Sequence, residues 1–221
     1  RIRIRLVEAG PRLLASFSTQ LSDRTKRDLE RLGVEVMLNT GVKQARSLSI
    51  LLNDDREISS EITIWTAGVQ VAPVVKELLL PMQDGRVKVA ETLQVANFER
   101  LFAIGDICGA KGADGRYLPM VAPVAMQQAR FVAKQIECIE RKEMLTNFRY
   151  LDKGSMATIG RHKAVVEVKG VRIGGALAWY MWLWLHLLYL LGGRNKIGTM
   201  ADWTWNYLTF DRGNRHIIDV V

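Results

Sequence analysis

The chain has 221 residues, enough for one large or two modest domains, and with 48% hydrophobic and 24% charged residues its composition is that of an ordinary globular protein. Its formal net charge of +8 favours an anionic partner, such as a membrane surface, a nucleic acid or phosphate groups. The two cysteines, Cys108 and Cys138, fit no metal or redox spacing, which excludes a cysteine-based motif and indicates free thiols.

The first predicted element is a strand within "RIRIRLVEAG" (1–10), which is not a signal peptide and carries no initiator methionine. We therefore expect a piece of a longer protein. Glu8 stands where a dinucleotide-binding unit places the acid that hydrogen-bonds the ribose of NADH. It also fits a surface glutamate before a Gly-Pro turn, and the glycine-rich loop that would decide between these readings would precede Arg1.

The next segments continue an α/β pattern. A helix is predicted over 18–32 with Ser18 as its N-cap, followed by a strand over 34–42. Short strands over 42–66 are interrupted by the turn "NDDRE", and "ITIWTAG" (62–68) reads as a further strand ending in glycine. Strand, helix, strand and meander describe the latter part of a nucleotide-binding domain.

An apolar run, "LFAI" (101–104), leads directly into Gly105 and Asp106 and reads as a buried strand. A carboxylate just beyond such a strand can accept hydrogen bonds from ribityl or ribose hydroxyls, and the glycine lets the backbone approach a ligand closely. An ordinary Gly-Asp turn fits these residues equally well.

A helix is predicted over 122–141, and its first turn carries the positive end of the helix dipole, which suits an electron-rich ring. Gln127 could hydrogen-bond a carbonyl of a bound ring compound, but a solvated glutamine fits as well. It lies roughly opposite the expected core stripe, which consists of Ala125, Ala129, Val132, Ile136 and Ile139.

The tail changes character. Residues 156–175 read as strands, and 176–191 are apolar all round without a formal charge, yet short of the roughly 20 residues of a membrane span. We expect a hairpin of two helices lying in one face of a membrane, although a buried core or dimer helix, or a single span, are alternatives. His186 reads as a packed histidine, and no metal site is expected. The expected membrane contacts are Trp179, Trp182, Trp184, Trp203, Trp205, Arg194 and Lys196.

Several motifs in combination resemble the type II NADH:quinone oxidoreductases, single-subunit respiratory flavoenzymes that do not pump protons. These are "LVEAGPRLL", "LGVEVMLNT", "IWTAGV", "LFAIGDIC", "APVAMQQAR", "DKGSMATIGRHKAVV" and "WNYLTFDRG". The resemblance covers essentially the whole chain and implies the C-terminal half of such an enzyme, because the family's two glycine-rich units are missing.

The resemblance implies an α/β fold: part of a Rossmann-like flavoprotein with two dinucleotide-binding domains, followed by a C-terminal domain of strands and a helical hairpin that binds membranes. Residues 1–92 would belong to the NADH-binding domain, 93–147 to the FAD-binding domain and 148–221 to the membrane-association domain. The isolated chain is expected neither to hold FAD nor to be active.

Site residues follow from the same resemblance. Glu8 would hold the NADH ribose, and Ala67 and Gly68 would lie beside the nicotinamide. Gln127 matches the last glutamine of the family's quinone motif, whose first glutamine is replaced by Pro123, so the quinone type stays open. The positions implied for FAD are Gly105, Asp106, Ala125, Lys153 and Gly154.

The implied activity passes electrons from NADH through FAD to a membrane quinone, with no protein nucleophile and no catalytic residue of its own. The implied setting is the cytoplasmic face of the cell membrane, as a peripheral, monotopic homodimer without nucleic acid. One alternative is a soluble FAD-dependent pyridine-nucleotide or sulfide:quinone oxidoreductase. Another is a non-catalytic basic protein that binds membranes.

Overall fold

The computed structural model describes residues 2–209, which form two compact units. The first unit combines the described residues up to Thr63 with those from Gly154 onward, and the second is Ile64–Lys153. The domain boundaries expected from the sequence stay predictions. The end of the "WNYLTFDRG" motif, from Phe210 onward, lies outside the described residues.

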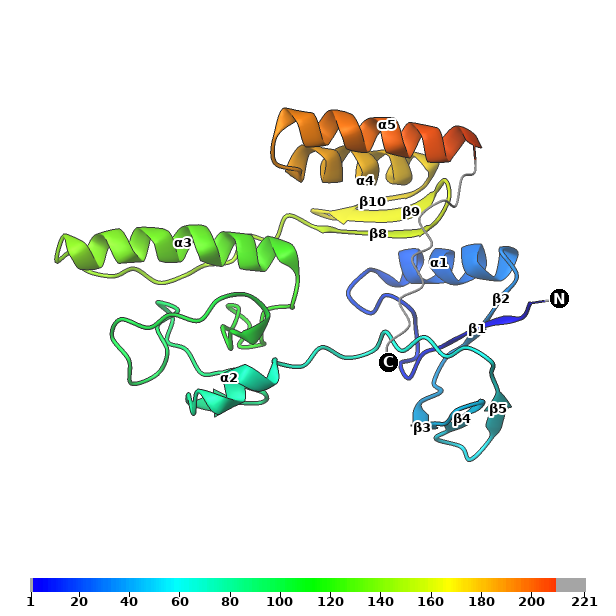
Figure 1. Cartoon of the computed structure of the whole chain (residues 1–221), viewed down its shortest axis with the longest axis horizontal. Helices are drawn as coiled ribbons and strands as arrows, with labels where there is room; N and C mark the ends of the chain where they lie inside the picture. Colours follow the sequence, from blue (N-terminus) through cyan, green and yellow to red (C-terminus); the bar gives the residue numbers. More distant parts are fainter. Residues whose placement is uncertain (1, 210–221) are drawn as a thin grey trace. The chain divides into compact units, whose positions relative to one another are not determined.

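The first unit begins with a strand–helix–strand arrangement (Figure 1). Strand β1 (Ile4–Val7) pairs in parallel with β2 (Val34–Met37), and α1 (Thr19–Arg31) connects them. The predicted helix with Ser18 as N-cap is confirmed, although the Ser18 side chain makes no capping hydrogen bond.

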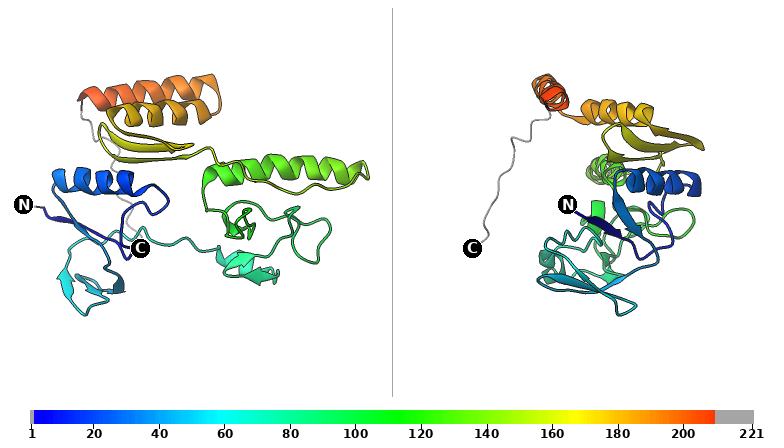
Figure 2. Two further views of the ribbon diagram at one scale, coloured as in Figure 1. Left: turned by 180° about the vertical axis from the view of Figure 1, so that it is seen from behind. Right: turned by 90° about the vertical axis from the view of Figure 1, so that its right-hand side faces the viewer.

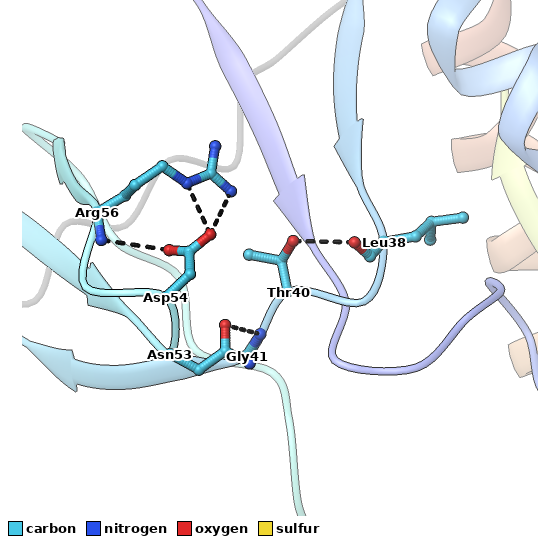
Figure 3. A network of polar contacts seen from close by, with 6 residues as sticks. All are labelled: Leu38, Thr40, Gly41, Asn53, Asp54 and Arg56. Atoms are coloured by element: carbon cyan, nitrogen blue, oxygen red, sulfur yellow. Dashed lines mark hydrogen bonds and ion pairs between the residues drawn. The ribbon is translucent and has the colours of Figure 1, made fainter.

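An antiparallel meander follows, with β3 (Val42–Ala45), β4 (Ser49–Leu52) and β5 (Glu57–Ser59) in that order. The predicted turn "NDDRE" connects its last two strands. Figure 3 shows how polar contacts shape this region: Asp54 accepts hydrogen bonds from the backbone and guanidinium nitrogens of Arg56, and Asn53 Oδ1 accepts one from Gly41 N. The buried Thr40 donates its hydroxyl to Leu38 O at 2.9 Å.

A three-stranded antiparallel sheet completes the core of the first unit and confirms the strands predicted over 156–175. Its strands are β8 (Ser155–Gly160), β9 (Lys163–Val168) and β10 (Val171–Gly175), with β9 in the centre. Figures 1 and 2 show this sheet between α1 and the hairpin of α4 and α5. Side chains alternate between the two faces of a sheet, so β9 packs against a helix on each face. Val165 packs with Phe17 and with Leu21 of α1, whereas Ala164 and Val166 pack with Ala178 of α4.

The predicted helical hairpin is present. Helix α4 (Ala176–Tyr189) packs on the sheet and is followed by α5 (Gly193–Thr209). Of the helices within residues 2–209, none combines the length and the apolar character that crossing a membrane requires.

The second unit is built around a long helix, α3 (Ala122–Glu140), close to the predicted bounds. It also contains α2 (Pro73–Glu77), the short strands β6 (Met82–Gln83) and β7 (Arg86–Val87), and the 3₁₀ turn η1 (Gly105–Ile107). One apolar cluster lies beneath α3, around Leu93, Cys108 and Val124. A second is formed by Val71, Val75, Val87, Val95 and Ala103.

Two predicted strands are wrong. Residues 62–68 have no regular secondary structure and are all exposed, and 101–104 contribute only an isolated bridge between Gln94 and Phe102. A strand requires a continuous ladder of hydrogen bonds to a neighbour, whereas residues 101–103 exchange only two backbone hydrogen bonds with Leu93 and Val95. Residues 62–68 are not even buried, so their apolar pattern indicated neither a partner strand nor burial.

The predicted core stripe of α3 is confirmed only at Val132, which is buried. Ala129 and Ile136 are exposed, whereas the buried face consists of Val124, Gln128, Val132 and Gln135. Two of these four are glutamines, and a search for apolar periodicity assigns such residues to the solvent side. Both are hydrogen-bonded, which is why burial is tolerated.

Candidate functional site

The Gly105–Ile107 turn packs against the N-terminal part of α3. Gly105 has a φ of +72°, in the left-handed region that favours glycine, and a Cβ placed on it would lie 3.7 Å from the Ala125 Cβ. The first turn of α3 contains no acidic residue. The turn that carries Asp106 therefore lies against the N-terminal half of α3.

Gln128 holds this turn, and the sequence reasoning missed it. Its side chain is 1% exposed, its Oε1 accepts a hydrogen bond from Gly105 N at 2.7 Å, and its Nε2 donates to Cys108 Sγ at 3.6 Å. Burial raises the pKa of the Cys108 thiol, so this group stays protonated and uncharged. The sequence did contain one signal for the burial of Gln128. Val124, Gln128 and Val132 are spaced four residues apart and therefore share one face of a helix, as the residues of the predicted stripe do.

Gln127 is not a solvated glutamine. Its Nε2 donates to Leu151 O and its Oε1 accepts from Leu151 N, both at 3.0 Å. The side chain therefore fastens the extended segment 150–153 to α3. Its role toward a quinone stays a prediction.

Asp106 and Lys153 both have exposed side chains. Within residues 2–209, neither side chain makes a hydrogen bond or an ion pair. A free carboxylate beside a glycine can accept hydrogen bonds from ribityl hydroxyls, and a free ammonium can balance negative charge on a ring system. These donor and acceptor types fit a flavin, so the residues present are compatible with FAD.

Gly154 belongs to the first unit, and the close packing of β8 against β9 explains why this residue is a glycine. Its φ is +94°, and a Cβ there would overlap Glu167 O and lie 2.7 Å from Val168 Cγ2. Only glycine allows β8 to begin this close to β9.

The other expected nucleotide contacts lie on separate segments. Glu8, at the end of β1, accepts a hydrogen bond from Gly10 N at 2.7 Å through its Oε1, and its backbone carbonyl accepts one from Thr40 N. In the second unit, Ala67 O accepts a hydrogen bond from the Trp65 indole, and Gly68 has a φ of +83°.

The structure divides the five tryptophans of the hairpin into two groups. Trp184 and Trp205 are 63% and 62% exposed. Trp179 packs against the sheet, Trp182 stacks on His186 with ring centroids 3.8 Å apart, and Trp203 is half-buried. Arg194 is exposed and Lys196 half-buried on the first turn of α5. An apolar stripe is exposed along α4 and beyond it, formed by Leu177, Tyr180, Trp184, Leu188 and Leu191.

A ring cluster around His162 ties the hairpin to the β8–β9 turn. The His162 imidazole lies 4.9 Å from the Trp179 ring, and its Nε2 is 3.0 Å from the Tyr207 hydroxyl. Arg161 lies over the Tyr207 ring. The sequence reasoning did not identify this cluster. Among residues 2–209 there is no group of three or more His, Cys, Asp or Glu side chains that could hold a metal ion.

Comparison with known proteins places these features in a family. Residues 2–129 match the model described as "Pyridine nucleotide-disulphide oxidoreductase", and residues 153–212 match "NDH2 C-terminal domain". The chain is 33% identical to the type II NADH:quinone oxidoreductase Ndh of Mycobacterium tuberculosis, over 99% of this chain and 49% of that protein. The chain therefore spans about half the length of this curated relative.

Two solved structures resemble the fold. NDH2 from Plasmodium falciparum in complex with NADH matches with a TM-score of 0.85 at 18% identity, covering 98% of this chain and 60% of that one. The sulfide:quinone oxidoreductase from Aquifex aeolicus matches with a TM-score of 0.68 at 13% identity, covering 96% and 54%. The α/β fold predicted from the sequence is confirmed.

Proposed function

Because the chain belongs to the pyridine nucleotide-disulphide oxidoreductase family, we propose that it is the C-terminal part of a type II NADH:quinone oxidoreductase. Such a protein passes electrons from NADH to a membrane quinone without pumping protons. The observation that supports the proposal is that two adjacent residues of α3 bind the two segments: Gln128 binds the Gly105–Asp106 turn and Gln127 binds the segment 150–153. The match of residues 153–212 to the NDH2 C-terminal domain supports it.

FAD, when bound, would accept a hydride from NADH and pass two electrons to the quinone. Asp106 would accept hydrogen bonds from the ribityl hydroxyls, with Gly105 and Ala125 leaving room for the chain. Lys153, followed by Gly154, would place a positive charge beside the ring and favour its reduced, negatively charged form.

In the first unit, the Glu8 carboxylate would accept hydrogen bonds from the ribose hydroxyls of NADH, and it would repel the 2′-phosphate of NADPH. Ala67 and Gly68 would line the nicotinamide path. Gln127 would face the quinone. It has one further donor hydrogen and further acceptor capacity beyond its two bonds to Leu151.

Within this chain, the two cysteines do not supply the redox pair that a sulfide:quinone enzyme needs at the flavin. Cys108 is buried beside Gln128, whereas Cys138 lies on α3 ten residues beyond Gln128, about 15 Å along a helix axis. Two thiols placed in this way do not form a redox pair.

The hairpin supports attachment to a lipid surface. The exposed stripe from Leu177 to Leu191 offers apolar side chains, and α5 adds exposed Ile197, Trp205 and Leu208. Arg194 and Lys196 would attract anionic headgroups. We place the protein at the cytoplasmic face of the cell membrane, as a peripheral, monotopic protein, and expect a homodimer.

The activity is tested on the intact protein in lipid vesicles with NADH and a short-chain quinone. We expect NADH consumption and quinol formation in equal amounts. Quinone reduction by sulfide in the absence of NADH would replace the proposal by the sulfide enzyme. If the protein binds vesicles but holds no flavin and does not oxidise NADH, the alternative of a non-catalytic membrane-binding protein would replace the proposal.

Membrane attachment is tested by vesicle sedimentation with Trp184→Ser. We expect binding to anionic vesicles to weaken about tenfold, because an indole is lost from the lipid-facing stripe. The matched control is Trp65→Ser, since Trp65 is 61% exposed but lies outside the hairpin. Equal binding by both variants would contradict the attachment through α4.

A further inference from the structure

We propose that Gln128 is the positioning residue of the flavin site: it fixes the Gly105 turn so that Asp106 presents its carboxylate to the cofactor. The proposal rests on the function proposed above. It concerns a residue that contacts neither the cofactor nor the substrate, but acts through the backbone of its neighbour.

The turn is closed by its own backbone hydrogen bond from Cys108 N to Gly105 O, and the Gln128 side chain fastens it to α3. Gly105 N donates to Gln128 Oε1 at 2.7 Å, and the φ of +72° at Gly105 sets the direction in which the chain leaves toward Asp106. The other end of the amide donates to Cys108 Sγ, so Gln128 joins both sides of the three-residue turn to α3.

Because Gln128 is buried, loss of its hydrogen bond with Gly105 N would be costly. Gln128 is 1% exposed, so an apolar replacement at this position would leave the half-buried Gly105 N without its protein acceptor. The turn would then move to satisfy the amide elsewhere, and Asp106 would move with it.

The neighbouring glutamine performs the same task for the other side of the site. Gln127 holds Leu151 through two backbone hydrogen bonds, two residues before Lys153. Successive residues on a helix project about 100° apart. The pair Gln127 and Gln128 can therefore reach two segments, one carrying Asp106 and the other carrying Lys153.

The helix supplies a matched control. Gln135 is 2% exposed on the same face of α3 and also uses both ends of its amide, with Thr146 N and Thr146 Oγ1 as partners. It holds the segment after the helix and contacts no residue of the candidate site. Loss of Gln135 should thus cost stability without changing the flavin site.

The experiment compares Gln128→Met and Gln135→Met in the intact protein, because methionine keeps the side-chain volume and removes the acceptor. FAD affinity is measured by flavin fluorescence, thermal unfolding by calorimetry, and protection of the Gly105 amide by hydrogen exchange. For Gln128→Met we expect an FAD Kd about tenfold higher, the order expected when one hydrogen-bonding group is misplaced, and loss of Gly105 protection. For Gln135→Met we expect a lowered Tm and an unchanged Kd.

Wild-type FAD affinity in Gln128→Met, or an equal loss in Gln135→Met, would overturn the proposal while leaving the proposed function intact. Failure of the wild-type protein to bind FAD would overturn both. If Gln128→Met does not fold, Gln128→Glu decides, because a carboxylate keeps the acceptor for Gly105 N. An FAD Kd within about twofold of wild type then supports the proposal, and a tenfold rise overturns it.

Discussion

Gly154 lies so close to the backbone of Glu167 that a methyl group on its α-carbon would overlap the Glu167 carbonyl oxygen and lie 2.9 Å from Val168 Cα. Gly154→Ala should therefore combine backbone strain with a steric conflict that β9 cannot relieve by a rotamer change. We expect a loss of about 3 kcal/mol or more in the free energy of unfolding, measured with urea.

Gly33→Ala separates the two causes. Gly33 has a similar φ of +85°, but nothing lies within 4 Å of its Cβ position. This variant should lose only about 1–2 kcal/mol, the cost of a left-handed conformation. Equal losses in the two variants would contradict the steric role of Gly154.

The two thiols should differ in reactivity. Burial raises the pKa of Cys108 and limits access to it, whereas Cys138 is partly exposed on α3. At neutral pH we expect a maleimide to label Cys138 at least about tenfold faster, since the thiolate is the reactive form. Mass spectrometry of the labelled peptides measures this, with denatured protein as the control in which both react. Fast labelling of Cys108 in the native protein would disprove the burial argument.

Glu167 should make stability depend on acid pH. A hydrogen bond from Ser18 N holds the pKa of this carboxyl below its ordinary value of 4.5, with a further contribution from Arg172. A lowered pKa means that the ionised group stabilises the fold above the ordinary value, and that this contribution is lost as the pH falls through the lowered one. Glu167→Gln should therefore be less stable than wild type at neutral pH, and the difference should shrink below pH 4.5.

Thermal unfolding across this pH range measures the effect of Glu167→Gln. Glu61→Gln is the control, because Glu61 is exposed and makes no ion pair or side-chain hydrogen bond within residues 2–209. A constant difference between Glu167→Gln and wild type at all pH values would rule out the linkage.

Glu8 should determine the choice of nucleotide in the intact protein. Replacing it by glutamine removes the charge that repels a 2′-phosphate, so the ratio of kcat/KM for NADH over NADPH should fall about tenfold. Glu35→Gln is the control, since Glu35 lies on β2 and pairs with Arg5 at 2.9 Å. An unchanged ratio in Glu8→Gln would remove this residue from the nucleotide site.

The sequence predicted helices well because their signals are local. Ser18 begins α1 and the apolar period identifies α3, in both cases within one or two residues of the observed bounds. The prediction failed for 62–68 and 101–104, because an apolar run does not specify a neighbouring strand, and at 62–68 it did not indicate burial either.

The candidate site was predicted only in part. The Gly105–Asp106 turn could be found because glycine and a carboxylate after an apolar run form a short-range pattern. The ties of Gln127 to Leu151 and of Gln128 to Gly105 could not, because each partner is a backbone group more than 20 residues away. Such partners carry no residue-specific signal, and a polar side chain on a helix is read as solvated until its partner is known.

The alternation along β9 has a geometric consequence. One strand supports α1 through Val165 and α4 through Ala164 and Val166, so these two helices are separated by a single sheet, with about 10 Å for each layer. If α4 rests on lipid, the sheet and α1 hold the end of β1, where Glu8 lies, at a set distance from the bilayer surface, in water. Should Glu8 hold the ribose of a nucleotide, as proposed, docking of the hairpin would also set the angle at which that nucleotide approaches the chain.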